Sequence, residues 1–133
     1  MITIEEFAQR AIDVPFKPHG RDWDAWDCWG LIYVAYKEVM GIELPRYDRD
    51  YTTVKDVQLL RRLFRHGIEK YWTEVDTVQP CDGIMYYATG ETSHVGLAVT
   101  STMMLHTEHG IGTTYEEINT KLRRTEGIYR YGK

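Results

Sequence analysis

The order of the hydrophobic patterns along the chain is the feature that most limits its fold. Up to Gly67 the apolar residues recur at helical spacing, whereas after Pro80 short β-like runs are separated by Gly, Thr and Ser. Strands that follow one another through short connections indicate antiparallel pairing, because parallel neighbours need a long crossover. The sequence therefore predicts an α+β domain with an antiparallel sheet, and it argues against repeated βαβ units.

The N-terminal part of the chain is predicted to form helices with recognisable ends. Thr3 and Glu6 have capping-box spacing and begin a short helix, which ends before Pro15. Asp27 is a good N-cap for a second helix, and Gly41 suits its left-handed stop. One apolar stripe of this second helix is expected to be buried, and it consists of Cys28, Leu31, Ile32, Ala35 and Val39.

Two further segments complete the predicted organisation before the strands. A third amphipathic stretch follows Thr53 and closes at Gly67, and its arginine-rich side is interpreted as solvated helix surface. Residues 14–26 have no period and hold two prolines and three aromatic residues, so a structured surface loop is expected there. The predicted strands are residues 84–87, 94–99, 103–106, 113–115 and 128–131.

Composition indicates a single globular domain, residues 1–133. Of these residues 43% are hydrophobic, which suffices for one core without disulfide bonds. The formal net charge of −4 argues against nucleic-acid binding. No run approaches about 20 apolar residues, so membrane insertion is not expected. The first fifteen residues lack the basic and apolar regions of a signal peptide, so we expect synthesis in the cytoplasm with Cys28 and Cys81 reduced.

Three residues of complementary chemistry are expected to meet, with Cys28 at the start of a helix and His94 and His106 on successive strands. A hairpin that turns at residues 100–102 pairs residues whose numbers sum to about 200, which places His94 opposite His106. A thiol at a helix N-terminus beside an imidazole is expected to have a lowered pKa and to act as a nucleophile. Cys28 should then react with iodoacetamide faster than Cys81.

In this interpretation His94 is the general base and His106 orients its ring. The backbone N–H of Cys28, unpaired in the first helical turn, is available to stabilise an oxyanion. The residues alone leave simpler interpretations open. A cysteine on a helix is often a small core residue, and a lone strand histidine is often a buried ring with its hydrogen bonds satisfied.

Three local strings resemble the NlpC family of cell-wall cysteine peptidases. Residues 27–46, DCWGLIYVAYKEVMGIELPR, are similar to the family's nucleophile segment, with Asp-Cys, an apolar helix and Leu-Pro-Arg. Residues 81–99, CDGIMYYATGETSHVGLAV, resemble the block that contains Ser-His-Val-Gly, and residues 104–107, MLHT, resemble the block with the third polar residue. The strings stand in the family's order and cover the chain from about Phe16 to His106.

The resemblance implies a papain-like fold, in which the helix bearing Cys28 packs on a sheet of five to six antiparallel strands. It implies Cys28 as the nucleophile, His94 as the general base and His106 as the third polar residue, with no cofactor and no metal. The implied reaction is hydrolysis of a peptide bond in the peptidoglycan stem peptide, at the γ-D-glutamyl link to the diamino acid, through a thioester on Cys28.

Two positions near the nucleophile depart from the family's pattern. Phe16 stands twelve residues before Cys28, where the family often has a tyrosine whose hydroxyl assists the oxyanion. Trp29 replaces the serine that usually follows the cysteine. The aromatic residues have two open interpretations, as a wall of the substrate groove or as a cover for the helix end. The predicted substrate-binding residues are Phe16, Trp23, Trp26, Trp29 and Ser93.

The string RDWDAWDCWG and the missing signal are most similar to the branch of the family found in phage tails and gene-transfer agents. This resemblance implies a tail-associated peptidase that phage tail proteins carry to the cell wall. One alternative is a structural tail-tip or assembly protein with a degenerate peptidase fold, and another is a papain-like acyltransferase or amidase. A third is a metal hydrolase using His94, His106 and His109, although no metal-binding motif supports it.

Overall fold

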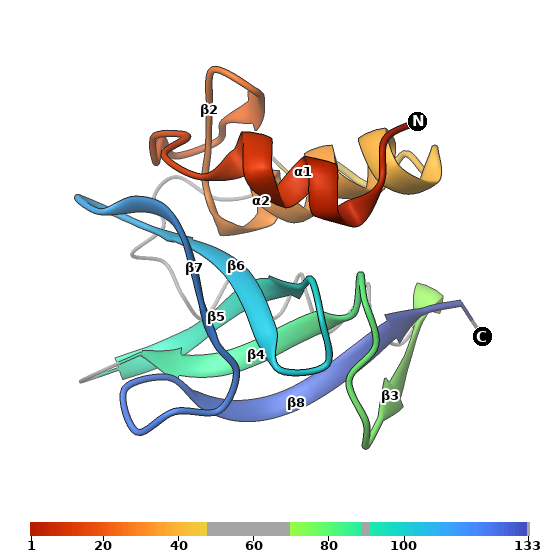
Figure 1. The fold of residues 1–133 in the computed structure, drawn as a ribbon, viewed down its shortest axis with the longest axis vertical. Helices are drawn as coiled ribbons and strands as arrows, with labels where there is room; N and C mark the ends of the chain where they lie inside the picture. Colours follow the sequence, from red (N-terminus) through yellow and green to blue (C-terminus); the bar gives the residue numbers. More distant parts are fainter. Residues whose placement is uncertain (48–69, 89–90, 133) are drawn as a thin grey trace.

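The computed structural model of the protein describes residues 1–47, 70–88 and 91–132, and of residues 88 and 91–93 it describes the backbone alone. The described chain forms two layers, with the helices lying over one face of a sheet (Figure 1). The helical layer contains α1 (Ile4–Ala11), α2 (Cys28–Ala35) and a π-helical extension of α2, η1 (Tyr36–Met40). A small hairpin, β1 (Arg21–Asp22) and β2 (Ala25–Trp26), lies between α1 and α2 in the sequence.

Six strands form the main sheet, in the order β3-β8-β4-β5-β6-β7, and every neighbouring pair is antiparallel. The predicted α+β class and antiparallel sheet are confirmed. The strand β3 was not predicted from the sequence, and it pairs with β8 at an edge of the sheet. The bounds of the strands are Trp72–Val75 (β3), Gly83–Ala88 (β4), Glu91–Ala98 (β5), Met103–Glu108 (β6), Gly112–Glu117 (β7) and Arg124–Tyr131 (β8).

The predicted ends of the first two helices are confirmed by their hydrogen bonds. The N–H of Glu6 donates to Thr3 Oγ1 over 3.1 Å at the start of α1. The N–H of Gly30 donates to Asp27 Oδ1 over 2.8 Å at the start of α2. The helical run ends at Gly41, which has a left-handed φ of 66°. The third predicted helix, after Thr53, lies outside the described residues.

The second helix is buried on all sides, whereas the sequence predicted one buried stripe. All eight residues of α2 are buried, because α2 contacts the sheet on one side and the β1–β2 hairpin on another. Alternate strand residues divide between the two faces of the sheet. Met85, Val95 and Leu97 face the main core with α2, and a smaller cluster forms on the opposite face from Ile84, Tyr86, Ala98 and Met104.

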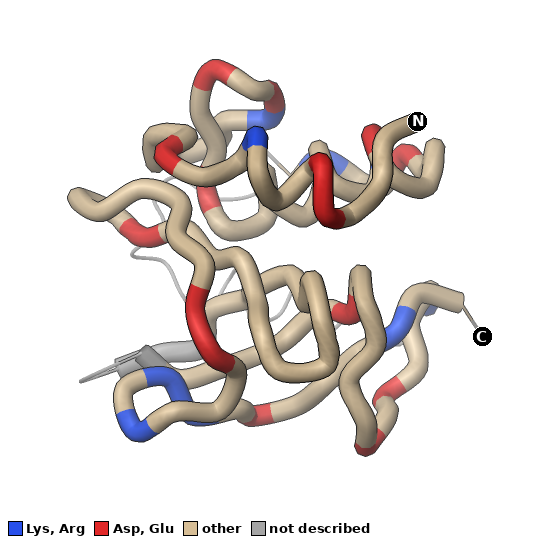
Figure 2. Tube along the Cα trace, in the orientation of Figure 1, with Lys and Arg blue, Asp and Glu red and all other residues tan. Residues whose placement is uncertain are grey.

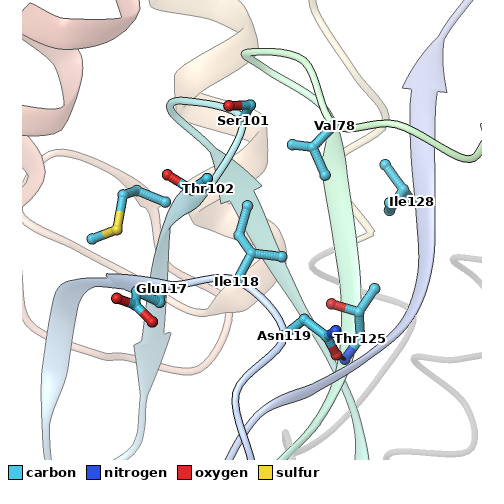
Figure 3. A pocket seen from close by; sticks show the side chains of 9 residues that line it. Val78, Ser101, Thr102, Glu117, Ile118, Asn119, Thr125 and Ile128 are labelled. Carbon is cyan, nitrogen blue, oxygen red and sulfur yellow. Dashed lines mark hydrogen bonds between the residues drawn. The ribbon is translucent and has the colours of Figure 1, made fainter.

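A surface cavity of about 590 Å³ lies beside the smaller cluster (Figure 3). It holds none of the predicted catalytic residues, so it does not mark the candidate active site. The lining of the cavity consists of Val78, Ser101, Thr102, Met103, Glu117, Ile118, Asn119, Thr125 and Ile128.

No helix among the described residues is both long and apolar enough to cross a membrane.

Candidate active site

The β5–β6 hairpin has a register two residues away from the predicted one. Leu97 pairs with Leu105, so His106 does not lie opposite His94. The turn itself lies where the sequence predicted it, at residues 100–102, with the N–H of Val99 donating to the carbonyl of Met103 and Thr100 Oγ1 accepting from the N–H groups of Thr102 and Met103. A three-residue turn centred on Ser101 pairs residues whose numbers sum to 202, so the predicted sum of 200 was wrong by two. A shift of two residues preserves the face on which a side chain lies. Both histidines therefore lie on the same face of the sheet as Tyr86, which contacts both of their rings and interacts electrostatically with Cys28.

The nucleophile candidate Cys28 is the first residue of α2 and is only 4% exposed. The backbone N–H groups of Val95 and Trp29 lie close enough to its sulfur to favour the charged thiolate. The paired part of β5 and β6 ends at Leu97, which pairs with Leu105. Val95 lies in β5 beyond this end and has no partner residue in β6. The end of the β5–β6 ladder thus leaves a strand N–H for the sulfur of Cys28.

Burial, together with the neighbouring carboxylate of Asp27, raises the pKa of the Cys28 thiol to about 12. Arg21 and the two backbone N–H groups lower this pKa, but burial outweighs them. The sequence-based expectation of a lowered pKa was therefore wrong for the free protein. A helix N-terminus stabilises a thiolate, but this effect is smaller than the cost of charging a sulfur that solvent hardly reaches.

A buried ion pair supports the start of α2. Arg21 Nη1 donates to Asp27 Oδ1 over 2.8 Å, and the two side chains are 2% and 1% exposed. Asp27 also accepts from the N–H groups of His19 and Gly30, at 2.9 and 2.8 Å. Arg21 Nε donates to the carbonyl of Arg46 over 2.8 Å. This network joins the β1–β2 hairpin to the residue directly before the nucleophile.

Tyr86 lies beside both histidine rings. Its ring stacks on that of His94 with centroids 5.6 Å apart, and it contacts the edge of His106 at 5.8 Å. Burial lowers the pKa of His94, so its imidazole is neutral at pH 7. No hydrogen bond joins Cys28 to His94 in the described part of the chain. Catalytic hydrogen bonds often form only once a substrate is bound.

The ring nitrogens of His106 lie close to Thr114, Glu116 and Glu108, and not to the ring of His94. Nε2 lies 3.1 Å from Thr114 Oγ1 and 3.5 Å from Glu116 Oε1, and Nδ1 lies 3.6 Å from Glu108 Oε1. Sequence reasoning did not identify these two carboxylates. The spacing of His106 and Glu108 along a strand was a usable signal, because residues two apart share a face. Within the described ranges, no three His, Cys, Asp or Glu side chains are arranged to hold a metal ion.

The aromatic residues predicted to bind substrate differ in exposure. Trp26 and Trp29 are 0% and 3% exposed, and their indole N–H groups donate to Thr113 Oγ1 and to the carbonyl of Pro45, both over 2.8 Å. Their burial assigns these two indoles to packing around α2 and corrects the prediction that they contact substrate.

Two of the predicted substrate-binding residues remain partly accessible. Phe16 is half-buried, and its ring meets the edge of His109 at 5.8 Å. Trp23 is also half-buried, with the guanidinium of Arg10 over its ring at 4.5 Å. The side chain of Ser93 lies outside the described residues. Phe16 and Trp23 are thus the predicted substrate-binding residues that the structure leaves able to touch a ligand.

The raised thiol pKa values reverse the expected order of alkylation. Burial raises the pKa of Cys81 to about 11, and Cys81 is more exposed than Cys28. We therefore expect iodoacetamide at pH 7.5 to modify Cys81 about tenfold faster than Cys28, because thiolate is the reactive form. Peptide mass spectrometry over a time course measures both rates. Faster labelling of Cys28 would show that its thiol is activated without substrate.

The sequence and the fold were compared with those of known proteins. Residues 13–128 match the sequence profile of the NlpC/P60 family. The structure is similar to the NlpC/p60 domain of the peptidoglycan hydrolase SagA, with a TM-score of 0.64 and 18% identity over 96% of each chain. It is also similar to a Staphylococcus aureus protein described as similar to a lipoprotein of the NLP/P60 family, with a TM-score of 0.66 and 21% identity.

The second alignment covers 98% of this chain and 41% of the S. aureus protein. At these identities the two solved structures establish a shared fold. No curated protein sequence has a significant match to the chain. Family membership therefore rests on the profile match over residues 13–128.

Proposed function

Because the chain belongs to the NlpC/P60 family, we propose that it is a cysteine peptidase that hydrolyses a peptide bond in bacterial peptidoglycan, with Cys28 as its nucleophile. The observation that carries this proposal is the position of the Cys28 sulfur, at the start of a buried helix and facing the N–H groups of Trp29 and Val95. A core cysteine needs no such donors, whereas a sulfur that becomes charged during a reaction does.

In the proposed mechanism both partners are neutral at rest. His94 takes the thiol proton as the sulfur of Cys28 attacks the carbonyl carbon of the substrate. The backbone N–H of Cys28 donates to the oxyanion. The C–N bond breaks as His94 gives its proton to the leaving amine, and a thioester remains on Cys28. Water, deprotonated by His94, then attacks the thioester and releases the carboxylic acid and the free thiol.

We propose the γ-D-glutamyl link to the diamino acid of the stem peptide as the bond that is cut. The support is the resemblance of residues 27–46 and 81–99 to the family's cysteine and histidine blocks. Phe16 and Trp23 are the proposed contacts to substrate. The string RDWDAWDCWG supports the further proposal that a phage tail carries the protein, made in the cytoplasm, to the cell wall.

The test of this function is incubation of the pure protein with purified muropeptides, followed by mass spectrometry of the products. A stem peptide cut between D-glutamate and the diamino acid is expected. Cleavage at another amide would retain the peptidase and overturn the bond assignment. Intact muropeptides at all pH values would overturn the enzymatic proposal and favour the structural tail protein.

The pKa of His94 predicts how activity depends on pH. His94 must be neutral to accept the thiol proton, and the neutral form predominates above its pKa. Burial lowers that pKa from 6.5. We therefore expect the acidic limb of the kcat/KM profile to have its midpoint below pH 6.5, as measured by initial rates on a stem peptide. A midpoint above 6.5 would mean that a nearby carboxylate dominates over burial.

A further inference from the structure

His106 is surrounded by three charged side chains, all of which lie beyond the part of the chain covered by the family-like strings. The His106 side chain is 0% exposed, and carboxylate oxygens lie near both ring nitrogens, Glu108 Oε1 3.6 Å from Nδ1 and Glu116 Oε1 3.5 Å from Nε2. Arg123 connects the two carboxylates. Its Nε lies 3.2 Å from Glu108 Oε1, and its Nη1 lies 2.8 Å from Glu116 Oε2.

The local backbone explains why these groups meet. His106 pairs with Thr114 across β6 and β7, so Glu108 and Glu116 are each two residues from this pair and share its face. Arg123 comes from the connection between β7 and β8, where its N–H donates to Thr120 Oγ1 over 3.1 Å. Figure 2 shows basic residues in this connection close to the acidic part of β7.

The cluster differs from an ordinary surface ion pair. Exposed ion pairs contribute little to the stability of the folded state, because water screens their charges and their side chains are mobile. Here Arg123 and Glu108 are 14% and 16% exposed while Glu116 is 36% exposed, and the guanidinium uses separate nitrogens for the two carboxylates. A forked donor of this kind fixes the direction of both acceptors, which a lysine ammonium does less well.

We propose that Arg123 is a positioning residue, which holds Glu108 and Glu116 against the two ring nitrogens of His106 and thereby sets the orientation and proton state of that ring. The catalytic consequence rests on the proposed peptidase function, in which His106 is the third polar residue. The effect on the His106 ring does not depend on that function. The candidate catalytic machinery thus extends into the β7–β8 connection.

The charges around His106 predict opposite effects for two substitutions. Burial lowers the pKa of His106, and Arg123 lowers it further, while Glu108 and Glu116 raise it. Tyr86 also contacts the ring, and burial holds its pKa well above the ordinary value and keeps it neutral. Removing the charge of Arg123 should therefore raise the pKa of His106, and removing that of Glu116 should lower it.

The direct test is NMR titration of the histidine rings in the full chain labelled with ¹⁵N, with the His106 signals assigned by a His106→Gln variant. Arg123→Gln should move the His106 midpoint upward and Glu116→Gln should move it downward. Arg124→Gln, which removes the charge of an exposed neighbour, should leave it unchanged. Shifts of the same sign in Arg123→Gln and Glu116→Gln, or no shift in either, would overturn the proposal.

Activity provides the second readout, on the same variants. A neighbouring charge typically moves a pKa by about one unit. Because the pKa of His106 starts below 6.5, Arg123→Gln should lower kcat/KM at pH 7 by about threefold at most, and it should move the acidic limb upward. Arg123→Lys should restore most of the NMR midpoint, because it keeps the charge. If Arg123→Gln does not fold, Arg123→Lys and Glu116→Gln decide the matter. An inactive wild-type protein with the expected NMR shifts would refute the peptidase proposal and leave the positioning of His106 intact.

Discussion

Replacement of Cys28 by serine is expected to reduce muropeptide hydrolysis by about 10⁴-fold or more while the protein stays folded. The hydroxyl occupies nearly the same volume as the thiol, so the start of α2 keeps its packing. The lost activity follows from the chemistry, because a buried hydroxyl is a much weaker nucleophile than a sulfur once His94 takes its proton. Product formation by mass spectrometry measures the loss, and circular dichroism checks the fold.

Cys81→Ser is the matched control for this experiment. Cys81 precedes β4 and lies on the side of the core where Tyr36 donates its hydroxyl proton to the Cys81 carbonyl over 2.5 Å. That hydrogen bond uses the backbone, so the serine variant keeps it. Activity of Cys81→Ser should equal that of the wild type. Hydrolysis that survives in Cys28→Ser would exclude Cys28 as the nucleophile.

The second large effect is expected at the ion pair below the nucleophile. Arg21→Met should lower the free energy of unfolding by about 3–5 kcal/mol, because it leaves the carboxylate of Asp27 buried without its charged partner. A loss of this size is a large fraction of the roughly 5–15 kcal/mol that stabilises a typical domain. Denaturation by urea, followed by tryptophan fluorescence, measures the change.

A double-mutant cycle separates the ion pair from the helix cap. Asparagine is also a good N-cap, so Asp27→Asn can keep the hydrogen bond from the N–H of Gly30 while it removes the charge. The double variant Arg21→Met with Asp27→Asn should be more stable than the sum of the single losses implies, because it contains no unpaired buried charge. Additive losses would mean that the two side chains stabilise the protein independently.

Local sequence signals predicted most of the fold, because each depends on residues close together in the chain. Thr3, Asp27 and Gly41 mark helix ends through their own hydrogen bonds and backbone angles. The alternation of apolar residues located five of the six strands of the main sheet. The edge strand β3 was not predicted, because its sequence, WTEV, is short and its partner in the sheet, β8, lies at the far end of the chain.

The candidate site was predictable as a set of residues and not as an electrostatic environment. The strings around Cys28, His94 and His106 identified the chemistry. The register of the β5–β6 hairpin was missed by two residues although its turn was predicted correctly at residues 100–102, because a turn centred on Ser101 pairs residues whose numbers sum to 202 and the prediction used 200. Arg123 was missed because it lies far from His106 in the sequence and meets it only through the folded sheet.

The sequence by itself determined the α+β class, the family and the identity of the candidate nucleophile and base, since these follow from local patterns and motifs. Only the tertiary structure decided the protonation of Cys28, the burial of Trp26 and Trp29 and the surroundings of His106. The physical reason is that desolvation and charge interactions depend on every group packed around a site. Those groups come from α2, the β1–β2 hairpin and the β7–β8 connection, which folding alone brings together.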